Sequence, residues 1–117
     1  MYKKQTIKWL ENKLTELLNE YSVSSQAKRK IMYYRIVGNR LKFARLVKKK
    51  TQKQIADHLN VTFQQIQKYE RGVNQTPSFN IMSICQYLDI DEKHIFKYFK
   101  QNKGENNVNY KNNRYTQ

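Results

Sequence analysis

Several residue types that build common sites are scarce in this chain of 117 residues. It has one cysteine, so no disulfide can form within the chain, and no Cys/His cluster has the spacing of a zinc site. Its three glycines form no loop that cradles a phosphate. The two histidines, His58 and His94, lie far apart, and neither has a carboxylate or cysteine at a catalytic spacing. We therefore expect no enzyme activity, no metal site and no cofactor.

Long apolar segments are also missing. No run approaches the roughly 18 residues of a membrane span, and the N-terminus lacks the continuous apolar core of a signal peptide. The lone cysteine, Cys85, has apolar neighbours at helical spacing and is expected to be a buried thiol. These features predict a soluble, cytoplasmic protein without membrane contact.

Acidic residues are few. Lys and Arg number 23 against 9 Asp and Glu, which gives a net charge of +14 and a pI near 9.9. A solvated surface is one interpretation of the excess, but one long segment carries eleven basic residues and no acidic one, so a nucleic-acid partner is favoured. These eleven residues are Lys28, Arg29, Lys30, Arg35, Arg40, Lys42, Arg45, Lys48, Lys49, Lys50 and Lys53.

The spacing of apolar residues predicts an amphipathic helix over residues 3–21. Its apolar face can form a dimer seam or pack on its own domain. The stretch Ser22–Ser25 breaks this pattern and offers the N-cap of a second helix, over residues 26–49, which we expect to be interrupted near Gly38. A second apolar stripe on that helix must be covered by the N-terminal helix or by another subunit. Three residues form this stripe: Phe43, Leu46 and Val47.

Two short helices follow, one ending at about Leu59 and the other at about Arg71. Each opens with a threonine and a glutamine that fit a capping box, and these pairs are Thr51 with Gln54 and Thr62 with Gln65. Ala56 allows a close helix crossing, and Asn60 and Gly72 tolerate the left-handed backbone of the tight turns. Together these features predict a helix-turn-helix. Its apolar contacts come from Ile55, Ala56, Leu59, Val61, Ile66 and Tyr69.

The second short helix has an outer face with no part in that core, formed by Phe63, Gln64, Gln67, Lys68 and Arg71. Gln64, Gln67 and Lys68 stand three or four residues apart and project together. They can be polar filler on a solvated helix, but a glutamine amide also pairs bidentately with adenine in the major groove of DNA. The surrounding positive charge favours the second interpretation.

The rest of the chain is expected to contain two further helices and a tail. Pro77 and Ser78 open a fourth core helix, and Asp91 caps a fifth. From Lys100 onward the chain is basic, rich in asparagine and almost without apolar residues, which predicts a disordered tail that is passive or touches phosphates weakly. We divide the chain into an N-terminal helical extension and linker (1–34), a helix-turn-helix domain (35–99) and the tail (100–117).

The order and spacing of several segments are those of a known family: Val37–Lys42 with Arg45, Thr51–Ala56, Leu59–Thr62, Tyr69–Gly72 and Pro77-Ser78. Over residues 37–96 the chain resembles the Cro/repressor (XRE-like) helix-turn-helix regulators of bacteria and phages. The resemblance implies an all-α fold, namely a five-helix lambda-repressor-like DNA-binding domain, here with an extra N-terminal amphipathic helix.

The resemblance also assigns roles to particular residues. It implies a partly buried ion pair between Arg45 and Glu70. The residues expected to contact DNA bases are Phe63, Gln64, Gln65, Gln67 and Lys68. The residues expected to contact phosphates are Gln52, Lys53, Thr62, Lys50, Asn74 and Gln75.

Two positions depart from the family pattern, which has a glycine and then an apolar residue before the first short helix. Lys49 replaces the glycine, so we expect a longer or differently bent turn. Lys50 replaces the apolar residue and brings a cation close to the expected phosphate.

The favoured hypothesis is a sequence-specific regulator of transcription, most simply a repressor, that binds a palindromic operator in double-stranded DNA as a homodimer. The alternative is an antitoxin-like module whose N-terminal helix or tail holds a protein partner while the domain represses its own promoter. The uncovered stripe on the second helix and the amphipathic helix over residues 3–21 motivate this alternative.

Overall fold

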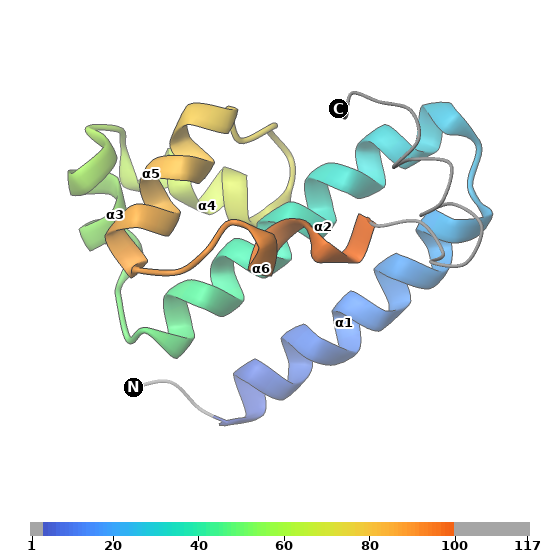
Figure 1. The fold of residues 1–117 in the computed structure, drawn as a ribbon, viewed down its shortest axis with the longest axis horizontal. Helices are drawn as coiled ribbons and strands as arrows, with labels where there is room; N and C mark the ends of the chain where they lie inside the picture. The colour runs from blue at the N-terminus through green and yellow to red at the C-terminus, as the bar shows by residue number, and fades with distance from the viewer. Residues whose placement is uncertain (1–3, 100–117) are drawn as a thin grey trace, which may run out of the picture.

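The computed structural model describes residues 4–99, which form six α-helices and one short 3₁₀ helix (Figure 1). No strand occurs in this part of the chain, and the expected all-α class is confirmed. The predicted tail from Lys100 lies outside the described residues. The elements are α1 (Lys4–Val23), α2 (Gln26–Val47), α3 (Gln52–Leu59), α4 (Phe63–Arg71), α5 (Ser78–Leu88), α6 (Lys93–Phe96) and η1 (Lys97–Phe99).

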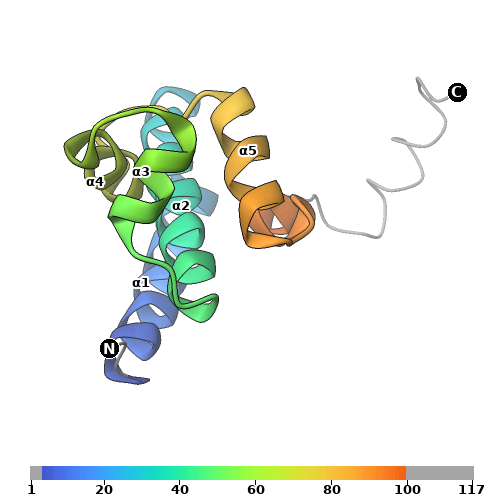
Figure 2. The same cartoon turned by 90° about the vertical axis from the view of Figure 1, so that its left-hand side faces the viewer.

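Helix α2 is the central element. Helix α1 runs antiparallel beside it (Figure 1), while α4 packs on one side of α2 and α5 on the other (Figure 2). The expected interruption of α2 at Gly38 is wrong, because the helix continues through this residue. Glycine is needed there for close packing: a Cβ atom would stand 2.6 Å from the carbonyl oxygen of Glu70 and would also meet that of Tyr69.

Side chains cap the helices largely as predicted. The Ser25 hydroxyl accepts from the Lys28 N–H at the start of α2. The full capping box is present at α3, where Thr51 and Gln54 exchange hydrogen bonds of 3.0 and 2.8 Å. At α4 only the threonine half of the expected box forms, through the hydrogen bond from the Gln65 N–H to the hydroxyl of Thr62.

Left-handed backbone ends four of the described helices, and at α5 the residue is Asp89 (φ 59°). Asn60 (φ 60°) and Gly72 (φ 74°) adopt it as predicted. Lys49 also adopts it, with a φ of 60°, and the N–H groups of Lys49 and Lys50 return to the carbonyls of Leu46 and Arg45. This is the Schellman arrangement, so the expectation of a longer or differently bent turn is wrong. The lysine takes up the backbone conformation that glycine adopts without strain.

Two apolar clusters hold the helices together. The larger cluster lies between α2 and the elements that follow it, and includes Cys85, whose pKa is raised to about 11 mainly by burial. The smaller cluster joins α1 to α2, so α1 packs on its own domain. The second stripe of α2 is largely covered: Leu46 is buried, Phe43 is half-buried below the guanidinium of Arg40, and Val47 remains exposed.

A buried polar network also ties α1 to α2. The guanidinium of Arg40, which is 2% exposed, donates to the side-chain oxygen of Asn39, and the Asn39 amide donates to the carbonyl of Leu10 at 3.1 Å. Glu11 of α1 lies 3.5 Å from the same guanidinium.

The boundary placed between residues 34 and 35 falls inside α2, and the division into domains stays a prediction. None of the described helices is long and apolar enough to cross a membrane.

Substitution of Lys49 by glycine tests the strain in the turn before α3. Glycine adopts the left-handed backbone without the steric cost that a Cβ atom brings, so Lys49→Gly should raise the free energy of unfolding by about 1 kcal/mol. Lys49→Ala removes the same charge but keeps the Cβ atom, and serves as the control. Urea denaturation of both variants measures the two free energies of unfolding. If Lys49→Gly were no more stable than Lys49→Ala, the strain attributed to the left-handed backbone at this position would be contradicted.

Candidate nucleic-acid interface

The packing of α4 determines which of its side chains face outward. Ile66 and Tyr69 are only 1% and 6% exposed, because they enter the core shared with α2 and α3. Gln64 and Lys68 are exposed. Phe63, at the first turn, is a 41% exposed aromatic residue. These three side chains form an outer face of α4 that offers an amide, an ammonium group and an apolar ring.

The two other glutamines of α4 lie closer to the protein. Gln65 and Gln67 are both half-buried. Gln67 lines a groove between α4 and the helices α1 and α2. The five residues expected to contact bases are therefore not equally accessible, and the exposed ones are Phe63, Gln64 and Lys68.

A buried ion pair between Arg45 of α2 and Glu70 fixes α4 in place. Two hydrogen bonds, of 2.6 and 3.0 Å, join the guanidinium to the carboxylate, and both side chains are 6% exposed. Such two-point contacts are among the stronger polar interactions in proteins and restrict orientation as well as distance. The third nitrogen of Arg45 donates to the carbonyl oxygen of Lys50 at 2.8 Å. One side chain thus joins α2, α4 and the turn that leads into α3.

Gln52 extends this network to the beginning of α3. Its amide donates to the Glu70 carboxylate at 2.9 Å, and the side chain is half-buried. A glutamine amide carries two hydrogens, so the second one remains for another acceptor. Because unpaired backbone N–H groups at a helix N-terminus also attract anions, this end of α3 is suited to a phosphate oxygen.

The other residues expected to contact phosphate have different surroundings. Thr62, Asn74 and Gln75 are exposed, and the Gln75 amide oxygen accepts from the hydroxyl of Tyr34 at 3.5 Å. Lys53 pairs with Asp57 of the same helix at 3.1 Å, and an exposed pair of this kind is easily exchanged for another partner.

The side chain of Lys50 reaches an aromatic residue of α5. Its ammonium nitrogen lies 5.3 Å from the centre of the Tyr87 ring on α5. That ring in turn stacks on the ring of His58, with 4.5 Å between their centres. The cation expected near a phosphate thus lies over an aromatic surface in this structure.

Three further cations, which the sequence shows but sequence reasoning did not assign to the site, lie around α4. Arg35, Lys42 and Arg71 line the groove that also contains Gln67. A partial signal exists, since Lys42 stands three residues before Arg45 and Arg71 four residues after Gln67, which places each pair on one helix face. No cluster of three or more potential metal ligands occurs among residues 4–99.

Comparison with known proteins agrees with this geometry. The family model described as a helix-turn-helix domain matches residues 38–105, more than half of the chain. Similar proteins include uncharacterized HTH-type transcriptional regulators from Sinorhizobium medicae and Rhizobium meliloti, each 34% identical over 61 residues, or 52% of this chain and 44% of the relative. One from Rickettsia conorii is 31% identical and is covered to 49%.

The chain spans about half the length of these curated relatives, and the family model covers α3, α4 and the turn between them. The match agrees with the order of α3, the turn at Asn60 and α4, and with the ion pair that holds them. The chain therefore belongs to the XRE-like family of helix-turn-helix regulators.

Proposed function

We propose that the protein is a sequence-specific, double-stranded-DNA-binding regulator of transcription, acting in the cytoplasm as a homodimeric repressor on a palindromic operator. The main support is the outer face of α4, where Gln64 and Lys68 are exposed while the buried Arg45–Glu70 pair holds the helix from behind. The net charge of +14 and the similarity to HTH-type transcriptional regulators agree with this role.

In the proposed complex α4 lies in the major groove. The Gln64 amide pairs with an adenine edge, Lys68 donates to guanine acceptors, and the ring of Phe63 lies against a thymine methyl group. Gln52 and the exposed loop residues Asn74 and Gln75 hold phosphates beside the groove, which fixes the position of α4 without reading sequence.

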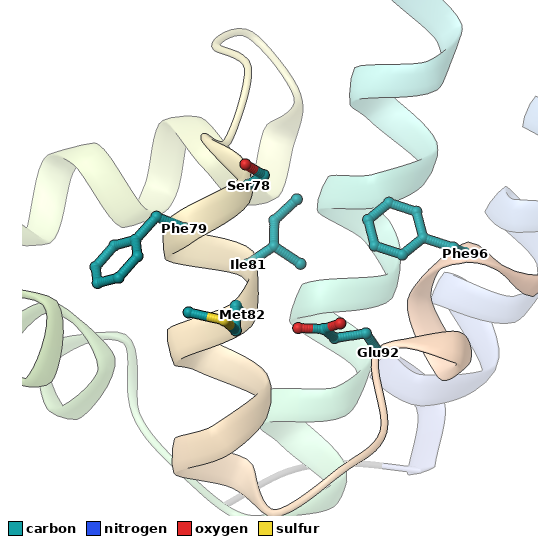
Figure 3. Close-up of a pocket in the computed structure, with 6 residues that line it drawn as sticks. All are labelled: Ser78, Phe79, Ile81, Met82, Glu92 and Phe96. Carbon is teal, nitrogen blue, oxygen red and sulfur yellow. The ribbon is translucent and has the colours of Figure 1, made fainter.

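An exposed apolar surface on α5 is the candidate contact for a second copy. A hollow of about 410 Å³ lies between α5 and α6, and Figure 3 shows Phe96 and Glu92 pointing across it toward α5. Phe79, at the first turn of α5, is 68% exposed. The surface begins four residues after Gln75, which the proposal places at a phosphate, so a second copy seated there would also lie near the DNA. Two-fold docking of this motif places the two copies on half-sites about one helical turn apart.

Repression needs only occupancy of promoter DNA, whereas activation needs an additional contact with the transcription machinery. Occupancy is what the described helices can supply, so we favour a repressor. The stripe that motivated the antitoxin-like alternative gives it little support, because Leu46 is buried and Phe43 is half-buried.

Binding should depend strongly on salt. If roughly six to ten phosphates are contacted, affinity should fall about 10³–10⁵-fold between about 50 and 200 mM salt, because each contact releases a counterion. A gel-shift titration measures this dependence, and a nearly flat response would contradict the proposal.

Gln64→Ala should cost about 1–3 kcal/mol of binding free energy at one base position and leave the salt dependence unchanged. The measurement is affinity for a set of duplexes that differ at single base pairs. Gln86→Ala, an exposed glutamine of α5, is the matched control and should have no effect. An equal loss on all duplexes would show that Gln64 does not read a base.

Phe79→Glu should weaken self-association, because a charge replaces the largest exposed apolar side chain of α5. A central aromatic residue of an interface commonly contributes about 2 kcal/mol or more. Analytical ultracentrifugation of the wild type and the variant measures the change. Val23→Glu adds the same charge at an 83% exposed position of α1 and should leave the dimer intact. If both variants formed dimers of equal strength, the surface around Phe79 would not be the dimer contact.

A further inference from the structure

The largest described groove lies where α1 approaches α4. It has a volume of about 710 Å³, and its walls come from the four helices α1, α2, α3 and α4. Trp9 and Lys13 line it from α1, and Gln67 and Arg71 from α4. Helix α1 precedes the region matched by the family model, so this groove is an addition to the helix-turn-helix.

The charge of the groove is mostly positive. Arg35 and Lys42 from α2 and Arg71 from α4 have no ion pair or side-chain hydrogen bond within residues 4–99. Lys13 lies 3.6 Å from Glu16, but that pair is exposed to solvent and therefore weak. Two carboxylates, Glu20 and Glu70, also line the groove.

Only one of these carboxylates can offset the cations. Glu70 is already held by Arg45 and by Gln52. The groove therefore presents four basic groups against the single carboxylate of Glu20, and an anionic occupant would compensate the excess.

The groove continues directly from the candidate DNA-binding surface. Gln52, which is suited to a phosphate at the start of α3, and Gln67 of α4 belong to its lining. A strand of DNA that passes Gln52 therefore reaches the groove next. Trp9 lies in the lining as well and is 57% exposed; its ring can pack on a deoxyribose and its N–H can donate to a phosphate.

We propose that this groove holds the sugar–phosphate backbone beyond the bases that α4 reads, so that α1 lengthens the contact with DNA. The proposal rests on the DNA-binding function proposed above. A chain of phosphates supplies repeated negative charge along the groove, which matches cations contributed by α1, α2 and α4 in succession. The contact is with backbone only, so it adds affinity on any sequence.

Trp9 provides a direct test, because it is the single tryptophan of the chain. Its fluorescence should change when a duplex is added and should saturate together with binding measured by the anisotropy of a labelled duplex. The duplexes are selected from random DNA and are used with and without about one helical turn of flanking sequence. The longer duplex should bind more tightly and change the fluorescence more.

Lys13→Gln combined with Arg35→Gln removes two groove cations outside the apolar cores. This variant should lose most of the extra affinity that flanking DNA gives to the wild type. The slope of log affinity against log salt should become less steep by about one for each cation removed. Lys93→Gln, on an exposed lysine of α6 outside the groove, is the control. It should keep the extra affinity of the wild type for the duplex with flanking DNA.

The outcomes separate the two proposals. Three results would overturn the groove contact: a double variant that keeps the extra affinity for the longer duplex and the salt slope, a double variant that binds more tightly, or Trp9 fluorescence that does not change. In each case, sequence-dependent binding through Gln64 would still support the proposed function. Failure of the wild type to prefer selected over random duplexes would overturn the proposed function, and the groove contact with it.

Discussion

The buried ion pair between Arg45 and Glu70 is the constraint on which the DNA-facing arrangement depends. It fixes α4 against α2 at two points, and through Gln52 and the Lys50 carbonyl it also fixes the start of α3. Loss of one partner would leave a buried charge unpaired, which commonly costs about 3–5 kcal/mol. Because α3 and α4 share this anchor, the spacing between Gln52 and Gln64 is fixed, and so would be the spacing of the phosphate and the base edge that they are proposed to contact.

The N-terminal helix extends this arrangement. It is joined to α2 by an apolar cluster and by the Asn39–Arg40 network, so it has a defined position beside α4. That position creates a cationic groove next to the anchored helices. A rigid α1 can contribute to binding without first losing conformational freedom, whereas a loose extension would have to be ordered on the DNA.

Local chemistry made much of the fold predictable. The Thr51–Gln54 box and the turns at Asn60 and Gly72 depend on neighbouring backbone groups, so the sequence contains the whole signal. Gly38 was misjudged because its role comes from close contact with Tyr69 and Glu70 of α4, which lie far along the chain. The outer face of α4 followed from helical spacing, but the groove did not, since it depends on where α1 docks.

The central claim is that the anchored α4 reads bases from the major groove in a symmetric pair of sites. Selection of bound sequences from random duplex DNA at controlled salt tests it most directly. The account predicts an enriched two-fold symmetric sequence whose half-sites are about one helical turn, roughly 34–36 Å, apart. A bound pool without any enriched sequence, under conditions where the folded protein binds DNA, would contradict it.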